Sequence, residues 1–204
     1  MLVEQIGRAI LTEAYGRLHV PVIFRERPAA RALAESAEGL TDGELQRVGG
    51  LSSSYPDLVQ VKVPVNYFDI VVLTRTAQFV PAGWNSLRPY TIGFHRGIVV
   101  FEQGTRGMKI DMAASNELVL RKLIGGRTDI ALMPDIEARQ LLATMPGHGI
   151  VTLQPSLERV QLFHYLHKQH VALVPRLEQV LAAMQADGSI VAIRTRLLAA
   201  AGQF

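Results

Sequence analysis

The chain has 204 residues, no cysteine and a formal net charge of 21 − 18 = +3. Apolar residues make up 49% of it and charged residues 19%, a composition that excludes a disordered chain and a coiled coil. The length is enough to bury a core, either in one large domain or in two small lobes. Because cysteine is absent, the chain has no disulfide, no thiolate metal ligand and no thiolate nucleophile.

The positive excess is spread along the chain in isolated pairs such as Arg25/Arg27 and Arg194/Arg196. A nucleic-acid-binding surface needs cations clustered on one face, so we expect no nucleic-acid partner, and the weak charge suits anionic small ligands equally. No stretch approaches the roughly 20 apolar residues that cross a bilayer, so we expect no membrane insertion. Residues 1–6 lack the basic region and apolar core of a signal peptide, which leaves a cytoplasmic protein or one whose leader lies outside this sequence.

Apolar residues at helical spacing predict an amphipathic helix at the start of the chain, and apolar runs predict strands between further helices. In chain order we predict a helix over 2–18, a strand over 19–24, a helix over 29–38, strands over 42–45, 59–65, 70–73 and 91–94, a helix over 98–103, a strand over 109–112, a helix to 124 with Ser115 as its N-cap, a strand over 129–133, a helix over 136–144, strands over 150–153 and 160–166, and helices over 175–186 and 189–200.

This alternation of short strands and helices predicts βα units and a largely parallel sheet. Two such series, each too short for a large sheet, favour two α/β lobes. Ligands of such folds bind beyond the carboxyl ends of the strands, so the residues that directly follow each strand are the candidates for a site.

Several common catalytic and cofactor motifs are absent. The sequence has neither the glycine-rich dinucleotide fingerprint nor a phosphate-binding loop, so we expect no nucleotide cofactor. It also has no Gly-x-Ser-x-Gly elbow and no His-Glu-x-x-His pair, which are the marks of two common classes of hydrolase. We therefore assign no catalytic residue.

Three histidines, His164, His167 and His170, are spaced three residues apart. On a helix they would share a face and could bind zinc or copper. His164, however, lies in a run with strand character, which would separate the side chains, and no nearby carboxylate would orient them. We favour structural and surface histidines and expect no metal.

Three charged residues follow predicted strands. Asp135 stands after a strand and at a helix start, where it could cap the helix or meet a ligand ammonium, and the cap is favoured. Arg47 and Arg96 stand at equivalent places in the two series, where a guanidinium is a natural partner of a ligand carboxylate. The alternative for each arginine is a solvated surface position.

Short motifs in a fixed order resemble a known family. Residues 84–87 (Trp-Asn-Ser-Leu) precede 91–97 (Thr-Ile-Gly-Phe-His-Arg-Gly), and residues 126–131 (Gly-Arg-Thr-Asp-Ile-Ala) follow, as in extracellular solute-binding proteins. The closest set is the polar amino-acid class of ABC-transporter binding proteins. Residues 42–47 (Asp-Gly-Glu-Leu-Gln-Arg) belong to the same pattern. The chain departs from it in starting at the first helix, without the strand that usually precedes it, and in having Ile98 where the family has Thr in a Gly-Thr turn.

The resemblance implies a two-lobed type II periplasmic-binding fold, an α/β protein with mixed, mostly parallel sheets and helices on both faces. Lobe 1 would comprise residues 1–75 and 156–204, and lobe 2 residues 76–155. By position the family pattern assigns ligand contacts to Gln46, Arg47, Thr74, Arg96, Gly97 and Asp135.

The resemblance also implies a function: a non-catalytic protein, located in the periplasm, that closes by a hinge on a small polar or anionic ligand. That ligand, amino-acid-like or an organic acid, would pass to an ABC-transporter permease or a sensor. One alternative is an enzyme on the same fold, of the cyclic-acid dehydratase type. Another is the effector-sensing part of a transcription regulator.

Overall fold

A computed structural model describes residues 2–145 and 147–202 of the chain. The chain divides into two compact units: unit 1 comprises the described residues up to Tyr67 and from Gln161 onward, and unit 2 comprises Phe68–Val160. The units change after residues 67 and 160, whereas the sequence-based lobe boundaries follow residues 75 and 155. Within the residues described, no helix combines the length and the apolar character that a membrane span requires.

Unit 1 contains a small antiparallel sheet and a layer of helices. Its elements are α1 (Leu2–Arg17), α2 (Ala29–Ala37), β1 (Gly43–Val48), β2 (Leu58–Gln60), most of β8 (Glu158–His167), α6 (Val174–Ala186) and α7 (Ser189–Ala200). Both β1 and β2 pair antiparallel with β8, with Glu44 opposite Tyr165 and Val59 opposite Leu166.

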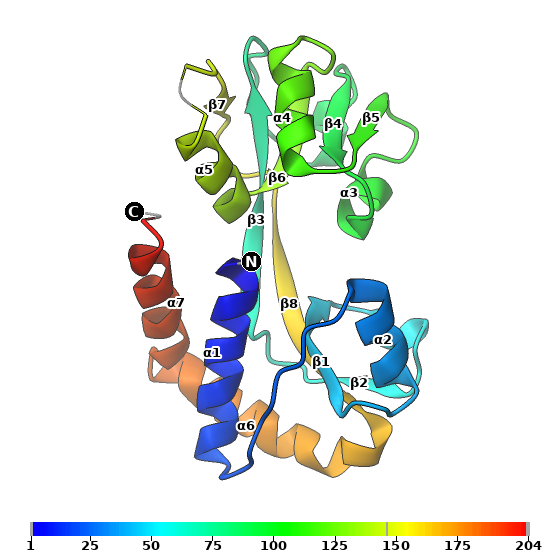
Figure 1. Cartoon of the computed structure of the whole chain (residues 1–204), viewed down its shortest axis with the longest axis vertical. Coiled ribbons are helices and arrows are strands. Elements are labelled where there is room, and N and C mark those ends of the chain that lie inside the picture. The colour runs from blue at the N-terminus through cyan, green and yellow to red at the C-terminus, as the bar shows by residue number, and fades with distance from the viewer. Residues whose placement is uncertain (1, 146, 203–204) are drawn as a thin grey trace. The chain divides into compact units, whose positions relative to one another are not determined.

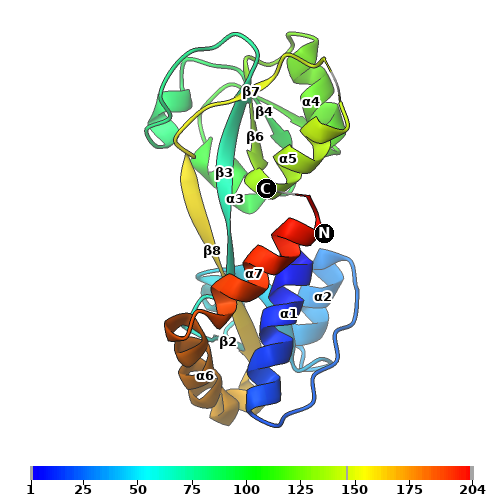
Figure 2. The same cartoon turned by 90° about the vertical axis from the view of Figure 1, so that its left-hand side faces the viewer.

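The predicted helix at the start of the chain is confirmed as α1. The apolar residues Ile6, Ile10 and Leu11, which fall on one face of a helix, are fully buried. They belong to the face of α1 that packs against α6 and α7, and Figures 1 and 2 show these three helices side by side. The hydrophobic pattern of α1 therefore forms the centre of the unit 1 core.

The predicted strand over 19–24 is wrong. Residues 20–28 have no regular secondary structure, and Ile23 in their middle is 82% exposed. A strand needs a neighbour to pair its backbone groups, and this segment pairs with none of the described strands. The strand predicted over 59–65 is shorter than expected, because β2 ends at Gln60. Pro64 has no backbone N–H to donate to a neighbouring strand.

Unit 2 contains the mixed part of the sheet, with helices between its strands. Its elements are β3 (Asn66–Thr74, which begins in unit 1), β4 (Ile92–His95), α3 (Val99–Gly104), β5 (Ile110–Ala113), α4 (Asn116–Ile124), β6 (Ile130–Pro134), α5 (Asp135–Ala143) and β7 (Val151–Thr152). The strand order is β3-β6-β4-β5, and β7 pairs with the end of β3. The α/β class and its mixed sheet are confirmed.

The sheet pairing differs from the mostly parallel arrangement that we predicted. Parallel pairing joins β4 to β5 and β4 to β6, whereas β3 runs antiparallel to β6. Every antiparallel pair among the described strands includes β3 or β8. These are the two strands on which the chain passes from one unit to the other. Only β4, β5 and β6 form the parallel part of the sheet.

The sheet of unit 2 is covered on both faces. Alternate residues of β3 and β6 enter two separate cores: Ile70 and Leu132 pack with Phe101 of α3, while Leu73 and Met133 pack on the opposite face with residues of α4 and α5. This alternation is the period-two geometry of a strand buried on both sides. Figure 2 shows α4 and α5 on one side of these strands and α3 on the other.

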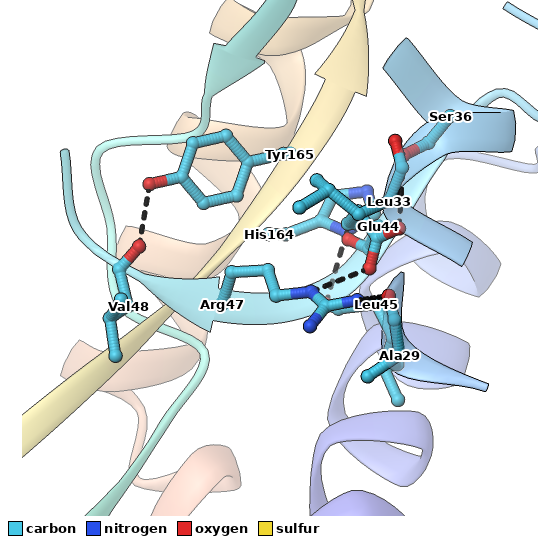
Figure 3. A network of polar contacts seen from close by, with 9 residues as sticks. All are labelled: Ala29, Leu33, Ser36, Glu44, Leu45, Arg47, Val48, His164 and Tyr165. Carbon is cyan, nitrogen blue, oxygen red and sulfur yellow. Dashed lines mark hydrogen bonds and ion pairs between the residues drawn. The ribbon is translucent and has the colours of Figure 1, made fainter. Parts of the chain in front are cut away.

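A buried histidine joins helix and sheet in unit 1. His164 of β8 is 6% exposed, and its Nε2 accepts a hydrogen bond of 2.8 Å from the Tyr15 hydroxyl of α1. Its Nδ1 lies 2.7 Å from the carbonyl oxygen of Glu44 and donates to it, as Figure 3 shows. Burial raises the pKa of Tyr15 and lowers that of His164 to about 4, so the neutral imidazole is the folded form.

This histidine predicts a loss of stability in mild acid. The unfolded chain has the ordinary histidine pKa of about 6.5, so between pH 6.5 and 4 it binds a proton that the folded protein does not. The free energy of unfolding is therefore highest above pH 6.5 and falls as the pH drops towards 4, by about 3 kcal/mol from this group. Urea unfolding of the wild type at a series of pH values measures this fall.

The control variants isolate the histidine from other titrating groups. We expect His164→Gln to be less stable than the wild type at about pH 7 but to lose less stability on acidification, since it has no imidazole to protonate. His170→Gln, which changes an exposed histidine paired with Asp42, should keep the full fall. An equal fall in the wild type and His164→Gln would contradict the assignment.

Candidate functional site

In unit 1, the predicted ligand residue Arg47 is engaged in a network of its own unit. Its Nε donates to a carboxylate oxygen of Glu44 at 2.8 Å, and its Nη2 donates to the carbonyl oxygen of Ala29 at 2.8 Å. Glu44 is 6% exposed and also accepts a hydrogen bond of 2.9 Å from Ser36, so Arg47 is its counter-charge. Figure 3 shows how these side chains join β1 to α2.

The predicted ligand residue Gln46 is also bonded within unit 1. Its Nε2 donates to the carbonyl oxygen of Val3 in α1 at 3.2 Å, and its Oε1 accepts from the Asn66 amide at 3.2 Å. Asn66 in turn accepts a hydrogen bond of 2.7 Å from the buried Arg194 of α7. Gln46 thus connects β1 to α1 and, through Asn66, to α7.

Thr74, a third predicted ligand residue, lies at the last position of β3 and is fully buried. Its hydroxyl donates to the carbonyl oxygen of Asp129 and accepts from the backbone N–H of Ala77. Because β3 runs antiparallel to β6, Thr74 stands opposite Ile130 at the amino end of the parallel strands. The structure therefore does not bring Thr74 together with Arg96 and Asp135, which follow the carboxyl ends.

The remaining predicted residues, Arg96, Gly97 and Asp135, share one edge of unit 2. Parallel strands end at the same edge of a sheet, and β4 lies between β5 and β6. The chain that leaves these three strands forms the turn at Arg96 and Gly97, the start of α4 and the start of α5. We call this the carboxyl edge of unit 2.

The turn after β4 needs glycine. Gly97 has a φ of +87°, a conformation that residues with a side chain rarely adopt. Its backbone N–H donates to a carboxylate oxygen of Glu102 in α3 at 2.8 Å, so this donor already has an anionic partner in the chain. The exposed side chain of Arg96 lines a pocket of about 470 Å³ that is bounded by β5 and α4.

Asp135 is the first residue of α5, and Pro134 occupies the cap position without a side-chain cap hydrogen bond. The favoured helix-cap role is therefore wrong. One carboxylate oxygen, Oδ1, accepts from the backbone N–H of Asp69 in β3 at 3.1 Å. The Asp69 carboxylate is held by two hydrogen bonds from Arg159, of 2.8 and 2.9 Å. The backbone bond fixes the direction of Asp135 beside the end of β6.

Two polar residues of this edge were missed by sequence reasoning. Asn116, at the start of α4, donates its amide to a carboxylate oxygen of Glu137 in the first turn of α5. Burial is the largest influence on Glu137 and raises its pKa, whereas His95 and Asn116 act in the opposite direction. The Asn116 side-chain oxygen is buried and has no hydrogen-bond partner among the described residues. Their shared position after parallel strands was the signal that could have found them.

Helix α4 starts at the carboxyl edge as the sequence predicts. The hydroxyl oxygen of Ser115 accepts from the backbone N–H of Leu118 at 3.3 Å, which confirms Ser115 as the N-cap. The positive end of this helix therefore also faces the edge.

The three histidines of the spaced series have separate surroundings. Besides the buried His164, His167 accepts from the backbone N–H of Gln169 through Nδ1, and His170 lies 2.7 Å from Asp42. Across residues 2–145 and 147–202, no three histidine, aspartate or glutamate side chains gather in a way that could hold a metal ion.

Comparison with known proteins gives relatives in sequence and in structure. No protein-family model matches the chain. An uncharacterized protein of Shewanella oneidensis is 26% identical over 187 residues, which cover 88% of this chain and 70% of that protein.

Solved structures with the same architecture are numerous, and three illustrate the range. The GluR0 ligand-binding core in complex with L-glutamate superimposes with a TM-score of 0.75 at 10% identity, covering 95% of this chain and 89% of that chain. A histidine kinase sensor domain with similarity to periplasmic binding proteins gives 0.73 at 16% identity, covering 95% and 85%. A probable amino-acid ABC transporter extracellular-binding protein from Bacillus subtilis gives 0.72 at 15% identity, covering 95% and 87%.

These comparisons establish the fold. The chain has a type II periplasmic-binding-protein-like α/β fold, as the sequence motifs predicted. The three structures described above are a ligand-binding core, a sensor domain and an extracellular-binding protein. At identities of 10–16% the likeness shows the fold alone and leaves the ligand to be argued from the residues of this chain.

The engagement of Gln46 predicts opposite effects of two glycine substitutions in α1. A Cβ at Gly7 would collide with the Gln46 side-chain oxygen, whereas a Cβ at Gly16 would meet nothing within 4 Å. We expect Gly16→Ala to raise the free energy of unfolding by up to about 1 kcal/mol, because alanine loses less backbone entropy in a helix. Gly7→Ala should instead lower it by about 1 kcal/mol, because Gln46 must leave one or both of its hydrogen bonds.

Urea unfolding of the two variants beside the wild type measures both effects. Gly16→Ala is the matched control, since it makes the same change in the same helix. If Gly7→Ala also stabilised the protein, Gln46 would have no structural bond to lose, and its side chain would be free for a ligand.

Proposed function

We propose that this protein is a non-catalytic solute-binding protein that captures a small polar or anionic ligand, amino-acid-like or an organic acid. The two compact units would be the two lobes of such a protein, and the carboxyl edge of unit 2 would supply ligand contacts. In this proposal Arg96, Gly97 and Asp135 keep the ligand roles that the family pattern assigns. Gln46, Arg47 and Thr74 serve the fold.

The observation that carries the proposal is a buried hydrogen-bond acceptor without a donor, at the same edge as a part-exposed carboxylate. The buried oxygen of Asn116 has no partner, and it belongs to the side chain that donates to Glu137. Asp135 stands at the same edge with one oxygen bonded to the backbone N–H of Asp69 and its carboxylate part-exposed. Buried acceptors are nearly always satisfied, so this edge suits a ligand that brings N–H donors, such as an ammonium group.

The same edge also offers a positive charge. The guanidinium of Arg96 is exposed after β4 and could hold a ligand carboxylate by two parallel hydrogen bonds. An edge that presents both acceptors and a cation suits a ligand with both an ammonium and a carboxylate group. This charge pattern favours an amino-acid-like ligand over a simple anion.

The fold supports the remaining parts of the proposal. Proteins of this architecture include an extracellular-binding protein of an ABC transporter and a kinase sensor domain, so the bound protein would deliver its signal or its ligand to a transporter or a sensor. The same likeness supports a periplasmic or extracellular location as part of this proposal. Differential contacts with a closed form would supply the energy for a hinge closure.

A thermal-shift screen of the protein amino acids and common organic acids tests the proposal, with calorimetry for any compound that raises the melting temperature. We expect an amino-acid-like compound to stabilise the wild type, and Asp135→Asn to weaken its binding by roughly tenfold or more through loss of a charged acceptor. Asp57→Asn, which changes a part-exposed aspartate paired with Lys168 in unit 1, should bind like the wild type.

Two results would contradict the proposal. If no compound shifts the melting temperature and none is carried through purification, as mass spectrometry would show, the protein does not bind such a ligand. If the bound acid is converted to a product, the enzyme on the same fold replaces the solute-binding protein.

A further inference from the structure

The pocket beside Arg96 has a lining unlike the carboxyl edge. It lies within unit 2, where α4 packs over β4 and β5 (Figure 1), and its volume is about 470 Å³, within the range of small-molecule sites. Four of the residues that line it are cationic, namely Arg96, Arg121, Lys122 and Arg127, and none of the others is acidic. The rest are small or apolar.

One carboxylate next to the pocket offsets part of this charge. Asp111 of β5 pairs with Lys122 at 2.6 Å and with Arg127 at 2.9 Å. The Lys122 ammonium is the main cause of a lowered pKa of Asp111, so the carboxylate stays charged at neutral pH. Lys122 also donates to the carbonyl oxygen of Met112, which holds it against β5. Asp111 and Lys122 are therefore each held by more than one contact beside the pocket.

A positive surplus remains around the pocket. One carboxylate faces four cations, and a second, Glu117, lies one helical turn from Arg121 on α4. Counting both carboxylates leaves a net charge of about +2 around a pocket whose lining also includes Met112 and Leu118. Guanidinium groups bind phosphate and carboxylate oxygens in pairs, and these apolar side chains suit the carbon body of an organic ion.

We propose that this pocket is a second binding site of unit 2, for a small anion with two or more negative charges, of the phosphate-ester or di- or tricarboxylate type. Arg121 and Arg127, both exposed, would bind the anion directly. Lys122 would position Asp111, which in turn contacts Arg127. The pocket meets the carboxyl edge at Arg96, Ala114 and Leu118, but Arg121, Lys122 and Arg127 lie outside that edge. It differs from the rest of the edge, where carboxylates and an unpaired amide oxygen favour a cationic group.

Calorimetric titration of the whole protein with sodium pyrophosphate and with sodium citrate, at constant ionic strength, tests this site. We expect the double variant Arg121→Gln, Arg127→Gln to weaken binding of both anions by roughly tenfold or more. The control is Arg106→Gln, which removes a cation of the same unit outside the pocket and should bind as tightly as the wild type. Thermal melting of each variant shows whether it is folded.

Three outcomes decide the proposal. Weaker binding in the folded double variant but not in Arg106→Gln supports a site in the pocket. Equal binding in all three proteins would overturn it, because the anions would then be held by diffuse charge alone. Absence of binding at about millimolar anion would overturn it as well.

Discussion

The parallel pairing of β4 with both of its neighbours is the constraint on which unit 2 depends. Ile92 of β4 lies opposite Ile110 of β5 on one side and opposite Ile130 of β6 on the other. All three strands therefore end at one edge, and every helix that follows them starts there. A shift of one residue in this register would turn the alternating side chains of β6 from one core to the other. Burial on both faces thus fixes the edge at which the polar groups meet.

The polar groups of the two units have different partners. In unit 1 the carboxylate of Glu44, the guanidinium of Arg47 and the imidazole of His164 are satisfied by neighbours in the same unit. Buried polar groups are stable only when they are paired, so these residues are committed to the fold. In unit 2 two buried side-chain oxygens, of Asn116 and of Thr128, have no partner among the residues that the structure describes, and only that of Asn116 lies at the carboxyl edge. A ligand that donates a hydrogen bond to such a group gains binding free energy, because the group has no competing partner in the protein.

The two cation-bearing places of unit 2 also differ in what they would bind. The carboxyl edge combines Asp135 and Glu137 with Arg96, so it is suited to a ligand that carries both charges. The neighbouring pocket is lined by Arg121 and Arg127 together with apolar side chains, and suits a multiply charged anion. Separate sites with different charge patterns would allow one unit to respond to two kinds of small molecule.

Hydrophobic periodicity and capping residues predicted most of the helices and strands, because these signals are contained in a few neighbouring residues. Helix α4, with Ser115 as its cap, follows this rule. The segment over 19–24 failed because its strand-like pattern says nothing about a pairing partner, which depends on distant parts of the chain. The same limit applies to the site: position after a strand selected Arg96 and Asp135, but it could not show that Arg47 neutralises Glu44. Asn116 was missed because its unpaired oxygen is a property of packing.

The central claim is that ligand binding is centred on the carboxyl edge of unit 2. The most direct measurement is the change of backbone amide NMR signals of the isotope-labelled protein when a mixture of the protein amino acids is added. The account predicts that the largest changes fall at residues 95–97, 115–117 and 135–137, which follow β4, β5 and β6. No change at these residues, or changes confined to other parts of the chain, would contradict it.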